Sequence, residues 1–183
     1  MNLEHSNNSG VLTWIKDKIY FIRNRISNNG NYEDNSGQKF IDIEVTNNCN
    51  ALCLFCPRDK TPETGFMNFE TFVKTVERAE EDNSPPIIHI CGLGEPLLHP
   101  EIIKFVKYLT DKHIFSRITT NASLLTPEMS RDLLKAGLKE LRVSVSGIDE
   151  SYNQIHKLNF SNVKQNLKYF LKQARKKINV VLL

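Results

Sequence analysis

Short apolar segments alternate with longer amphipathic segments along most of the chain. Five short segments are rich in Ile, Val and Thr and flanked by polar residues, which is typical of strands. They span residues 39–46, 86–91, 116–120, 141–146 and 178–183. Between them, apolar residues recur three to four positions apart, as in helices that cover a sheet. These predicted helices span residues 69–80, 101–110, 127–137 and 163–176.

This order of elements predicts an α/β fold. Repeated strand–helix units with short apolar strands favour a parallel sheet covered by helices, because parallel strands need crossover connections. Sequential strands of such units usually lie side by side, so we expect 178–183 to pair with 141–146. No helix follows 178–183 in the sequence. We therefore expect the sequence to be a fragment of a longer protein whose sheet continues.

The first 38 residues follow a different pattern. Residues 11–26 place Ile and Leu at helical spacing opposite Lys and Arg, which predicts one amphipathic helix. Residues 27–38 are rich in Asn, Gly and Ser and indicate a linker. The helix is expected to pack on the following domain, and the alternative is a helix that lies on a membrane surface. The predicted organisation is a helix and linker at 1–38 and an α/β domain at 39–183.

Composition narrows the function classes. The chain is 40% hydrophobic and 25% charged, with a net charge of +3, which is ordinary for a globular protein. No apolar run approaches the ~20 residues of a membrane span, and no secretory signal is visible. The mild charge does not by itself indicate a nucleic-acid partner. We expect a cytoplasmic protein, where thiols stay reduced and disulfides are disfavoured.

Three of the four cysteines form one tight group directly after the first predicted strand. Cys49, Cys53 and Cys56 have the spacing C-x3-C-x2-C. Thiolates are the usual ligands of iron–sulfur clusters, and three of them can hold three irons of a cubane. The fourth iron would then be open to a ligand, as in catalytic metal sites. The alternative is a zinc site completed by Cys91 or a histidine.

A second motif follows the second predicted strand. Residues 92–96 read Gly-Leu-Gly-Glu-Pro, and glycines at a strand end let the backbone approach a ligand closely. Carbonyl groups and a carboxylate at this turn would suit an ammonium group. Both motifs should lie at the carboxyl edge of the sheet, where parallel sheets and barrels place their sites.

The cysteine loop, the Gly-Glu-Pro turn and the strand–helix order together make residues 40–183 resemble the radical S-adenosylmethionine (SAM) superfamily. The chain is most similar to members that carry a second cluster-binding domain of the SPASM or twitch type. This resemblance implies a parallel (β/α) partial barrel with six strands, of which this chain contains about five. It departs from the family at Ala122, where Gly commonly follows the Asn.

The resemblance also implies cofactors and roles. A 4Fe–4S cluster on Cys49, Cys53 and Cys56 would bind SAM and cleave it to a 5′-deoxyadenosyl radical for hydrogen abstraction from a substrate. The electron would come from an external donor such as flavodoxin or ferredoxin. The residues expected around SAM are Phe55, Gly94, Glu95, Pro96, Thr120, Asn121 and Ser144.

Two other functions stay open. A truncated remnant could hold the cluster without cleaving SAM, because the sixth strand is missing from the sequence. An RNA-modification factor would use the basic stretch 157–183, although this stretch is better explained as a solvated helix face. Cys91, His99 and His156 are expected to be structural residues.

Overall fold

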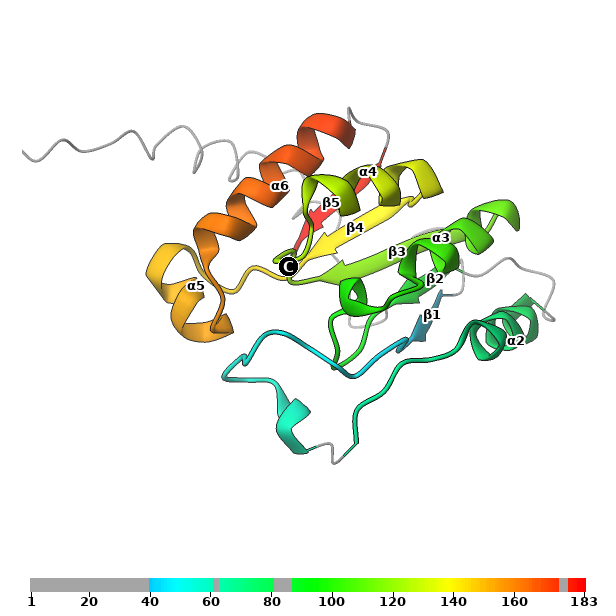
Figure 1. Cartoon of the computed structure of the whole chain (residues 1–183), viewed down its shortest axis with the longest axis horizontal. Coiled ribbons are helices and arrows are strands. Elements are labelled where there is room, and N and C mark those ends of the chain that lie inside the picture. Colours follow the sequence, from blue (N-terminus) through cyan, green and yellow to red (C-terminus); the bar gives the residue numbers. More distant parts are fainter. Residues whose placement is uncertain (1–39, 61–62, 81–86, 175–177) are drawn as a thin grey trace, which may run out of the picture. The chain divides into compact units, whose positions relative to one another are not determined.

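A computed structural model of the chain describes residues 40–60, 63–80, 87–174 and 178–183 (Figure 1). They all belong to one compact unit. The predicted helix at 11–26 and the linker at 27–38 lie outside the described residues. In the described part of the chain, no helix has both the length and the apolar character required to cross a bilayer.

Five parallel strands form one sheet in sequential order. They are β1 (Phe40–Ile43), β2 (Ile87–Ile90), β3 (Phe115–Thr120), β4 (Glu140–Val143) and β5 (Asn179–Leu182). The register places Asp42 of β1 beside His89 of β2, and His89 beside Arg117 of β3. The predicted parallel α/β fold is confirmed, including the pairing of the last strand with β4.

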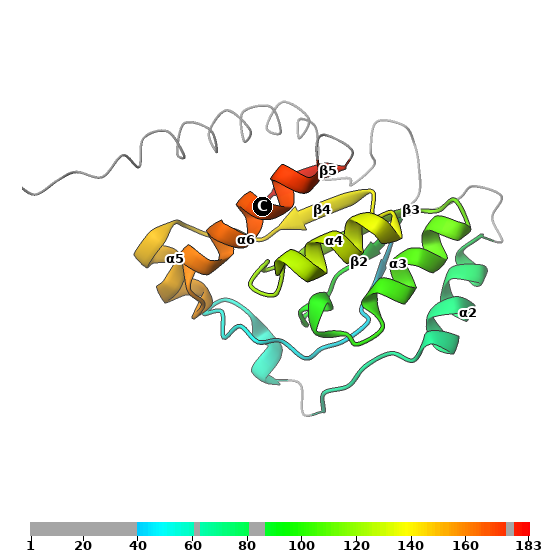
Figure 2. The same cartoon turned by 45° about the horizontal axis from the view of Figure 1, so that its top comes forward.

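Within the described residues, four helices lie along one face of the sheet, and α5 (Asp149–His156) lies beyond its end (Figure 2). Those at the four expected positions are α2 (Phe69–Glu80), α3 (Ile102–Asp111), α4 (Pro127–Ala136) and α6 (Phe160–Ala174). Short 3₁₀ helices span Pro57–Lys60 and Pro96–Leu98, and the further helix α5 was not predicted. The reason is its weak pattern, because only Tyr152 and His156 of its eight residues are buried.

Local sequence explains the bounds of α4. The Thr126 side chain accepts a hydrogen bond from the Met129 N–H, and Pro127 occupies the first helical position. Gly137 ends the helix in the left-handed conformation, with a φ of 92°.

The two faces of the sheet differ in chemistry. Ile88 and Ile90 of β2 and Leu141 of β4 face the helices and are fully buried in the apolar core. Alternate strand positions point away from the helices and carry polar groups, including Asp42 and His89. On this second face Arg117 and Glu140 are buried and form an ion pair, whereas Asp42 is exposed and available for binding.

Candidate functional site

The cysteine loop leaves β1 and is closed at its base by hydrogen bonds. Thr46 forms an antiparallel bridge with Phe66, and its hydroxyl donates to the Gly65 carbonyl at 2.6 Å. The Asn47 side chain donates to the Glu63 carbonyl at 2.7 Å and accepts from the Gly65 N–H at 2.8 Å. These contacts join residues 46–47 to residues 63–66 and so fix both ends of the loop beside the carboxyl edge of the sheet.

The three thiols of this loop are half-buried. Burial raises the pKa of Cys49 and Cys53, and for Cys53 the neighbouring thiols Cys49 and Cys56 raise it further. Negative charge on Cys49 or Cys56 therefore disfavours ionisation of Cys53. A positively charged group bound among them would reverse this effect and release their protons. The donor set and its partial exposure fit a metal cluster.

Helix α5 packs directly against the cysteine loop. The Leu52 N–H donates to the His156 carbonyl at 3.3 Å, and the Leu54 N–H donates to the Ile155 carbonyl at 2.9 Å. Cys53 Sγ lies 3.3 Å from His156 Nδ1. The C-terminal end of α5 therefore supports the loop through both backbone and side chain.

His156 is oriented by its second nitrogen. Its side chain is buried, its ring stacks on Tyr152 at 4.3 Å, and Nε2 accepts from the Ser146 N–H at 3.1 Å. Burial lowers the pKa of His156, which favours the neutral ring. Since Nε2 accepts, the proton of the neutral ring is on Nδ1 and points at Cys53 Sγ. The sequence pattern indicated only a structural histidine here, because α5 itself was not recognised.

Glu95 ties the second motif to the end of β3. Its carboxylate is 2% exposed and accepts from the Thr120 hydroxyl at 2.6 Å, the Asn121 N–H at 2.8 Å and the Leu97 N–H at 3.1 Å. Burial raises the pKa of Glu95, while these three donors favour its ionised form. The carboxylate points into the protein, where it joins β2 to β3.

Two further contacts bind the motifs together. Gly94 packs so closely on the cysteine loop that a Cβ there would clash with the carbonyls of Thr46 and Asn48. The Glu95 N–H donates to the Asn48 carbonyl at 2.7 Å. The glycine is required by this close approach of two backbones.

Asn121 links the end of β3 to the cysteine loop. Its amide donates to Asn50 Oδ1 at 3.0 Å, and its carbonyl oxygen Oδ1 accepts from the Ser123 N–H at 2.9 Å. The Asn50 amide in turn donates to the Ser123 hydroxyl at 2.8 Å. Ala122, which lies between Asn121 and Ser123 in the chain, has a φ of 59°, in the left-handed region that favours glycine. The predicted residues Thr120 and Asn121 thus form part of one polar network with the two motifs.

The other predicted residues lie along the same edge. Pro96 is buried, and the Ser144 N–H donates to the Thr120 carbonyl at 2.9 Å, which places half-buried Ser144 at the end of β4. His99 is buried and its Nε2 lies 2.8 Å from the Met67 carbonyl, as expected of a structural histidine. Cys91 groups with Asp42 and His89.

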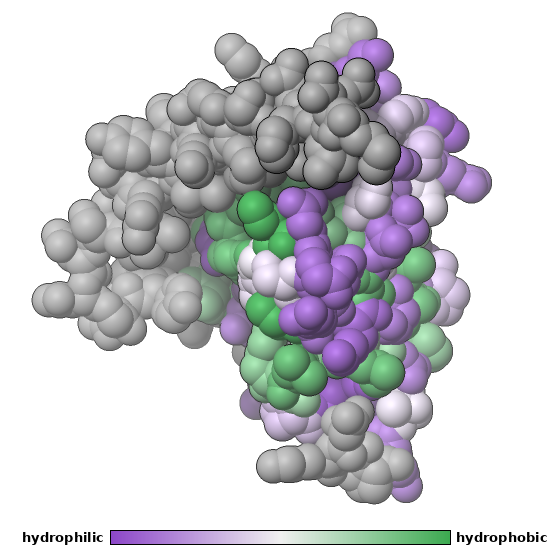
Figure 3. Space-filling view, turned by 90° about the vertical axis from the view of Figure 1, so that its left-hand side faces the viewer, coloured by the Kyte–Doolittle hydropathy of each residue, from purple (hydrophilic) through white to green (hydrophobic). Residues whose placement is uncertain are grey.

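The surface around the cysteine loop carries exposed apolar side chains. Leu52, Leu54 and Phe55 of the loop are exposed, Phe55 by 65%, and Ile148 before α5 is partly exposed. The Phe55 ring meets His156 edge-on at 5.7 Å. Figure 3 views the side on which α5 lies and shows apolar patches around a polar centre. Exposed apolar groups of this kind mark surfaces that contact a ligand or a partner.

The sequence of the chain is similar to the sequences of known proteins. The profile of the Radical SAM superfamily matches residues 43–183. The chain is 29% identical over 118 residues to the tungsten-containing aldehyde ferredoxin oxidoreductase cofactor-modifying protein of Pyrococcus furiosus. It is 36% identical over 124 residues to the GTP 3′,8-cyclase of Campylobacter jejuni.

These matches cover part of each relative. They include 64% and 63% of this chain, but only 33% and 38% of the two relatives. Among solved structures, native anSMEcpe with bound AdoMet has a TM-score of 0.65 at 22% identity, over 79% of this chain and 43% of that one. At this identity the likeness supports the fold, a partial barrel of parallel strand–helix units.

Proposed function

The chain belongs to the Radical SAM superfamily, and we propose that it binds a 4Fe–4S cluster through Cys49, Cys53 and Cys56 and SAM at the adjoining edge of the sheet. One observation carries this proposal. The three thiols share a loop that a polar network fixes against the ends of β2 and β3. The same network joins the thiol loop to most of the residues expected around SAM.

When bound, the cluster supplies the electron that cleaves SAM and starts hydrogen abstraction from a substrate. The chain's own residues prepare the site. His156 directs its Nδ1 proton at the sulfur of Cys53, where it would lower the negative charge on a ligand thiolate. Glu95 fixes the 92–96 turn against β3 and so holds the backbone in place.

The SAM contacts divide between backbone and side chains. The Glu95 carboxylate is buried and already accepts three hydrogen bonds. We therefore expect the backbone carbonyls of residues 92–94 to accept the hydrogen bonds from the amino group of SAM. Phe55 offers an exposed ring for the adenine. Ser144 at the end of β4 is expected to contact the same cofactor.

The substrate is not assigned by these residues. The relatives named above act as a cofactor-modifying protein and as a GTP cyclase, and the matched region is about a third of each. The second cluster-binding domain of the SPASM or twitch type stays a prediction, as do the flavodoxin or ferredoxin donor and the cytoplasmic location. The proposed activity of the described domain is reductive cleavage of SAM.

Anaerobic reconstitution tests this proposal. We expect about four irons per chain after treatment with iron and sulfide, and release of 5′-deoxyadenosine when dithionite and SAM are added. Cys53→Ser should lose both, whereas Cys91→Ser, which changes a cysteine outside the loop, should keep both. A protein that holds the cluster but releases no 5′-deoxyadenosine would be a cluster-binding remnant. One that takes up zinc and no iron would contradict the proposal.

A further inference from the structure

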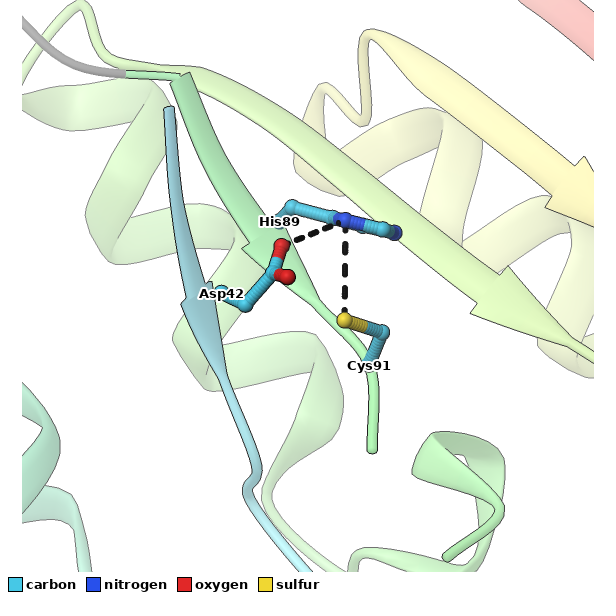
Figure 4. A group of neighbouring side chains, drawn as sticks. All are labelled: Asp42, His89 and Cys91. Atoms are coloured by element: carbon cyan, nitrogen blue, oxygen red, sulfur yellow. Dashed lines mark hydrogen bonds and ion pairs between the residues drawn. The ribbon is translucent and has the colours of Figure 1, made fainter. Parts of the chain in front are cut away.

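A second group of metal-binding side chains lies on the face of the sheet that points away from the helices. Asp42 comes from β1, and His89 and Cys91 come from β2 and the residue after it (Figure 4). Their ligand atoms all lie within 4.8 Å of one another. The parallel register sets Asp42 directly beside His89, so the backbone itself brings these side chains together.

Two of these groups converge on a single nitrogen. Asp42 Oδ1 lies 2.8 Å from His89 Nδ1, and Cys91 Sγ lies 3.5 Å from the same atom. A catalytic relay of Cys, His and Asp would instead use the two ring nitrogens in series. One nitrogen can offer only one proton or one lone pair, so it cannot bond fully to both neighbours. A cation among the three would contact all of them.

The other nitrogen of His89 has a separate partner. Nε2 lies 2.7 Å from the hydroxyl of Thr119 on β3, which fixes the orientation of the ring. Histidine ligands of metals commonly bond through their second nitrogen to such a group. Without a cation, Nδ1 donates to the Asp42 carboxylate and Nε2 accepts from the Thr119 hydroxyl. On binding a cation, Nδ1 would offer its lone pair to the ion, and the proton on Nε2 would be donated to the Thr119 oxygen.

The distances suit a tetrahedral ion. Zinc binds nitrogen and oxygen at ~2.0–2.2 Å and sulfur at ~2.3 Å, so neighbouring ligand atoms are roughly 3.3–3.6 Å apart. The 3.5 Å between Cys91 Sγ and His89 Nδ1 lies in this range. The 2.8 Å between Asp42 Oδ1 and His89 Nδ1 is a hydrogen-bond distance, so the Asp42 carboxylate would move about 0.5 Å away from the ring to admit the ion. An aspartate and a thiolate would also balance the charge of a divalent ion, with neutral imidazole as the third ligand.

We propose that Asp42, His89 and Cys91 form a binding site for a zinc-type divalent cation, separate from the cysteine loop. The three ligands leave the fourth tetrahedral position for water or a polar group of a bound molecule. The Asp42 side chain is 59% exposed, so the site is accessible from solvent.

The surroundings explain why the thiol needs a cation to ionise. Burial and the acids Asp42 and Glu44 raise the pKa of Cys91 to about 12, and the Arg142 guanidinium opposes this shift only in part. The free thiol therefore stays protonated at neutral pH. Binding of a divalent ion would displace this proton, as it does for other cysteine ligands.

Cobalt binding gives a direct test. In the variant with Cys49, Cys53 and Cys56 all replaced by serine, Co²⁺ can reach only one remaining thiol. We expect one equivalent of Co²⁺ to produce sulfur-to-cobalt charge-transfer absorption and tetrahedral d–d bands, and one equivalent of Zn²⁺ to abolish them. Adding Cys91→Ser should remove the charge-transfer band, and Thr119→Val should weaken Zn²⁺ binding about 10–100-fold. Absence of the band, or its persistence in Cys91→Ser, would overturn the proposal.

A second measurement keeps the test valid if the triple variant fails to fold. The unmodified chain with its cluster reconstituted is mixed with Zn²⁺, passed over a chelating resin and assayed for zinc and iron. We expect one zinc per chain, lost in His89→Gln and Cys91→Ser while the iron content is unchanged. Equal zinc in the unmodified chain and both variants would refute the site. This result does not depend on SAM cleavage, so the two proposals fail separately.

Discussion

Replacing Glu95 tests how the two site motifs are held together. Glu95→Ala deletes the acceptor of three buried hydrogen bonds, from the Thr120 hydroxyl and from the N–H groups of Asn121 and Leu97. The hydroxyl can rotate toward another partner, but the two N–H groups are fixed by the backbone. Each donor left unpaired costs about 1–3 kcal/mol, which gives about 2–6 kcal/mol in total.

A second effect opposes this loss. Burial raises the pKa of Glu95, which means that the charged carboxylate is less stable in the folded protein than in water. Replacing it with alanine removes this unfavourable contribution to folding. We therefore expect the lower part of the range, a decrease of about 2–4 kcal/mol in the free energy of unfolding. This is a large part of the ~5–15 kcal/mol that stabilises a typical domain.

Urea unfolding followed by circular dichroism measures the change. Glu95→Gln should also destabilise, by about 1–3 kcal/mol, because its amide NH₂ must face at least one of the N–H donors. Glu101→Ala is the matched control, since the side chain of this glutamate lies at the surface and forms an ion pair with Lys104, at 2.8 Å. It should change stability by less than about 1 kcal/mol. Losses under about 1 kcal/mol for both Glu95 variants would refute the reasoning.

Three further outcomes follow from the same contacts. His156→Phe keeps an aromatic ring but removes the N–H directed at Cys53, so the cluster potential should fall by about 20–65 mV in an EPR-monitored titration, and an unchanged potential would contradict this role of His156. Gly94→Ala forces the two motifs apart and should reduce the iron retained after reconstitution, whereas Gly65→Ala, where a Cβ meets open space, should not. The raised pKa of Glu95 means that the folded state binds its proton more tightly than the unfolded state. The stability of the wild type relative to Glu95→Gln should therefore increase as the pH falls from neutral toward 4.5, and an opposite trend in urea unfolding would contradict this sign.

The sequence was sufficient for features that depend on neighbouring residues. Period-two and period-3.6 patterns located all five strands and four of the helices, and the cysteine spacing marked the loop. The predicted ends of β1 and β4 were three residues too late. The reason is that residues 44–46 and 144–146 continue the alternation of apolar and polar residues beyond the last strand residue. Helix α5 was missed because two buried side chains do not make a recognisable stripe.

Side-chain contacts between distant residues could not be predicted, although the pairing of β4 with β5 was. Glu95 meets Thr120 across 25 positions, and Cys53 meets His156 across 103. Asp42 and His89 are 47 positions apart. Asp42 was only one polar position of an alternating segment, and His89 was one polar position in a short apolar segment. Their contact depends on the register between β1 and β2, which the pattern within one strand does not specify.

The central claim is that the cysteine loop holds a cluster whose open iron accepts SAM. The most direct test is the EPR spectrum of the reconstituted, dithionite-reduced chain recorded with and without SAM. We expect the signal of a reduced 4Fe–4S cluster that changes in shape when SAM is added, and no such signal when Cys49, Cys53 and Cys56 are all replaced by alanine. A cluster signal that SAM leaves unchanged, or one that survives the triple replacement, would contradict the claim.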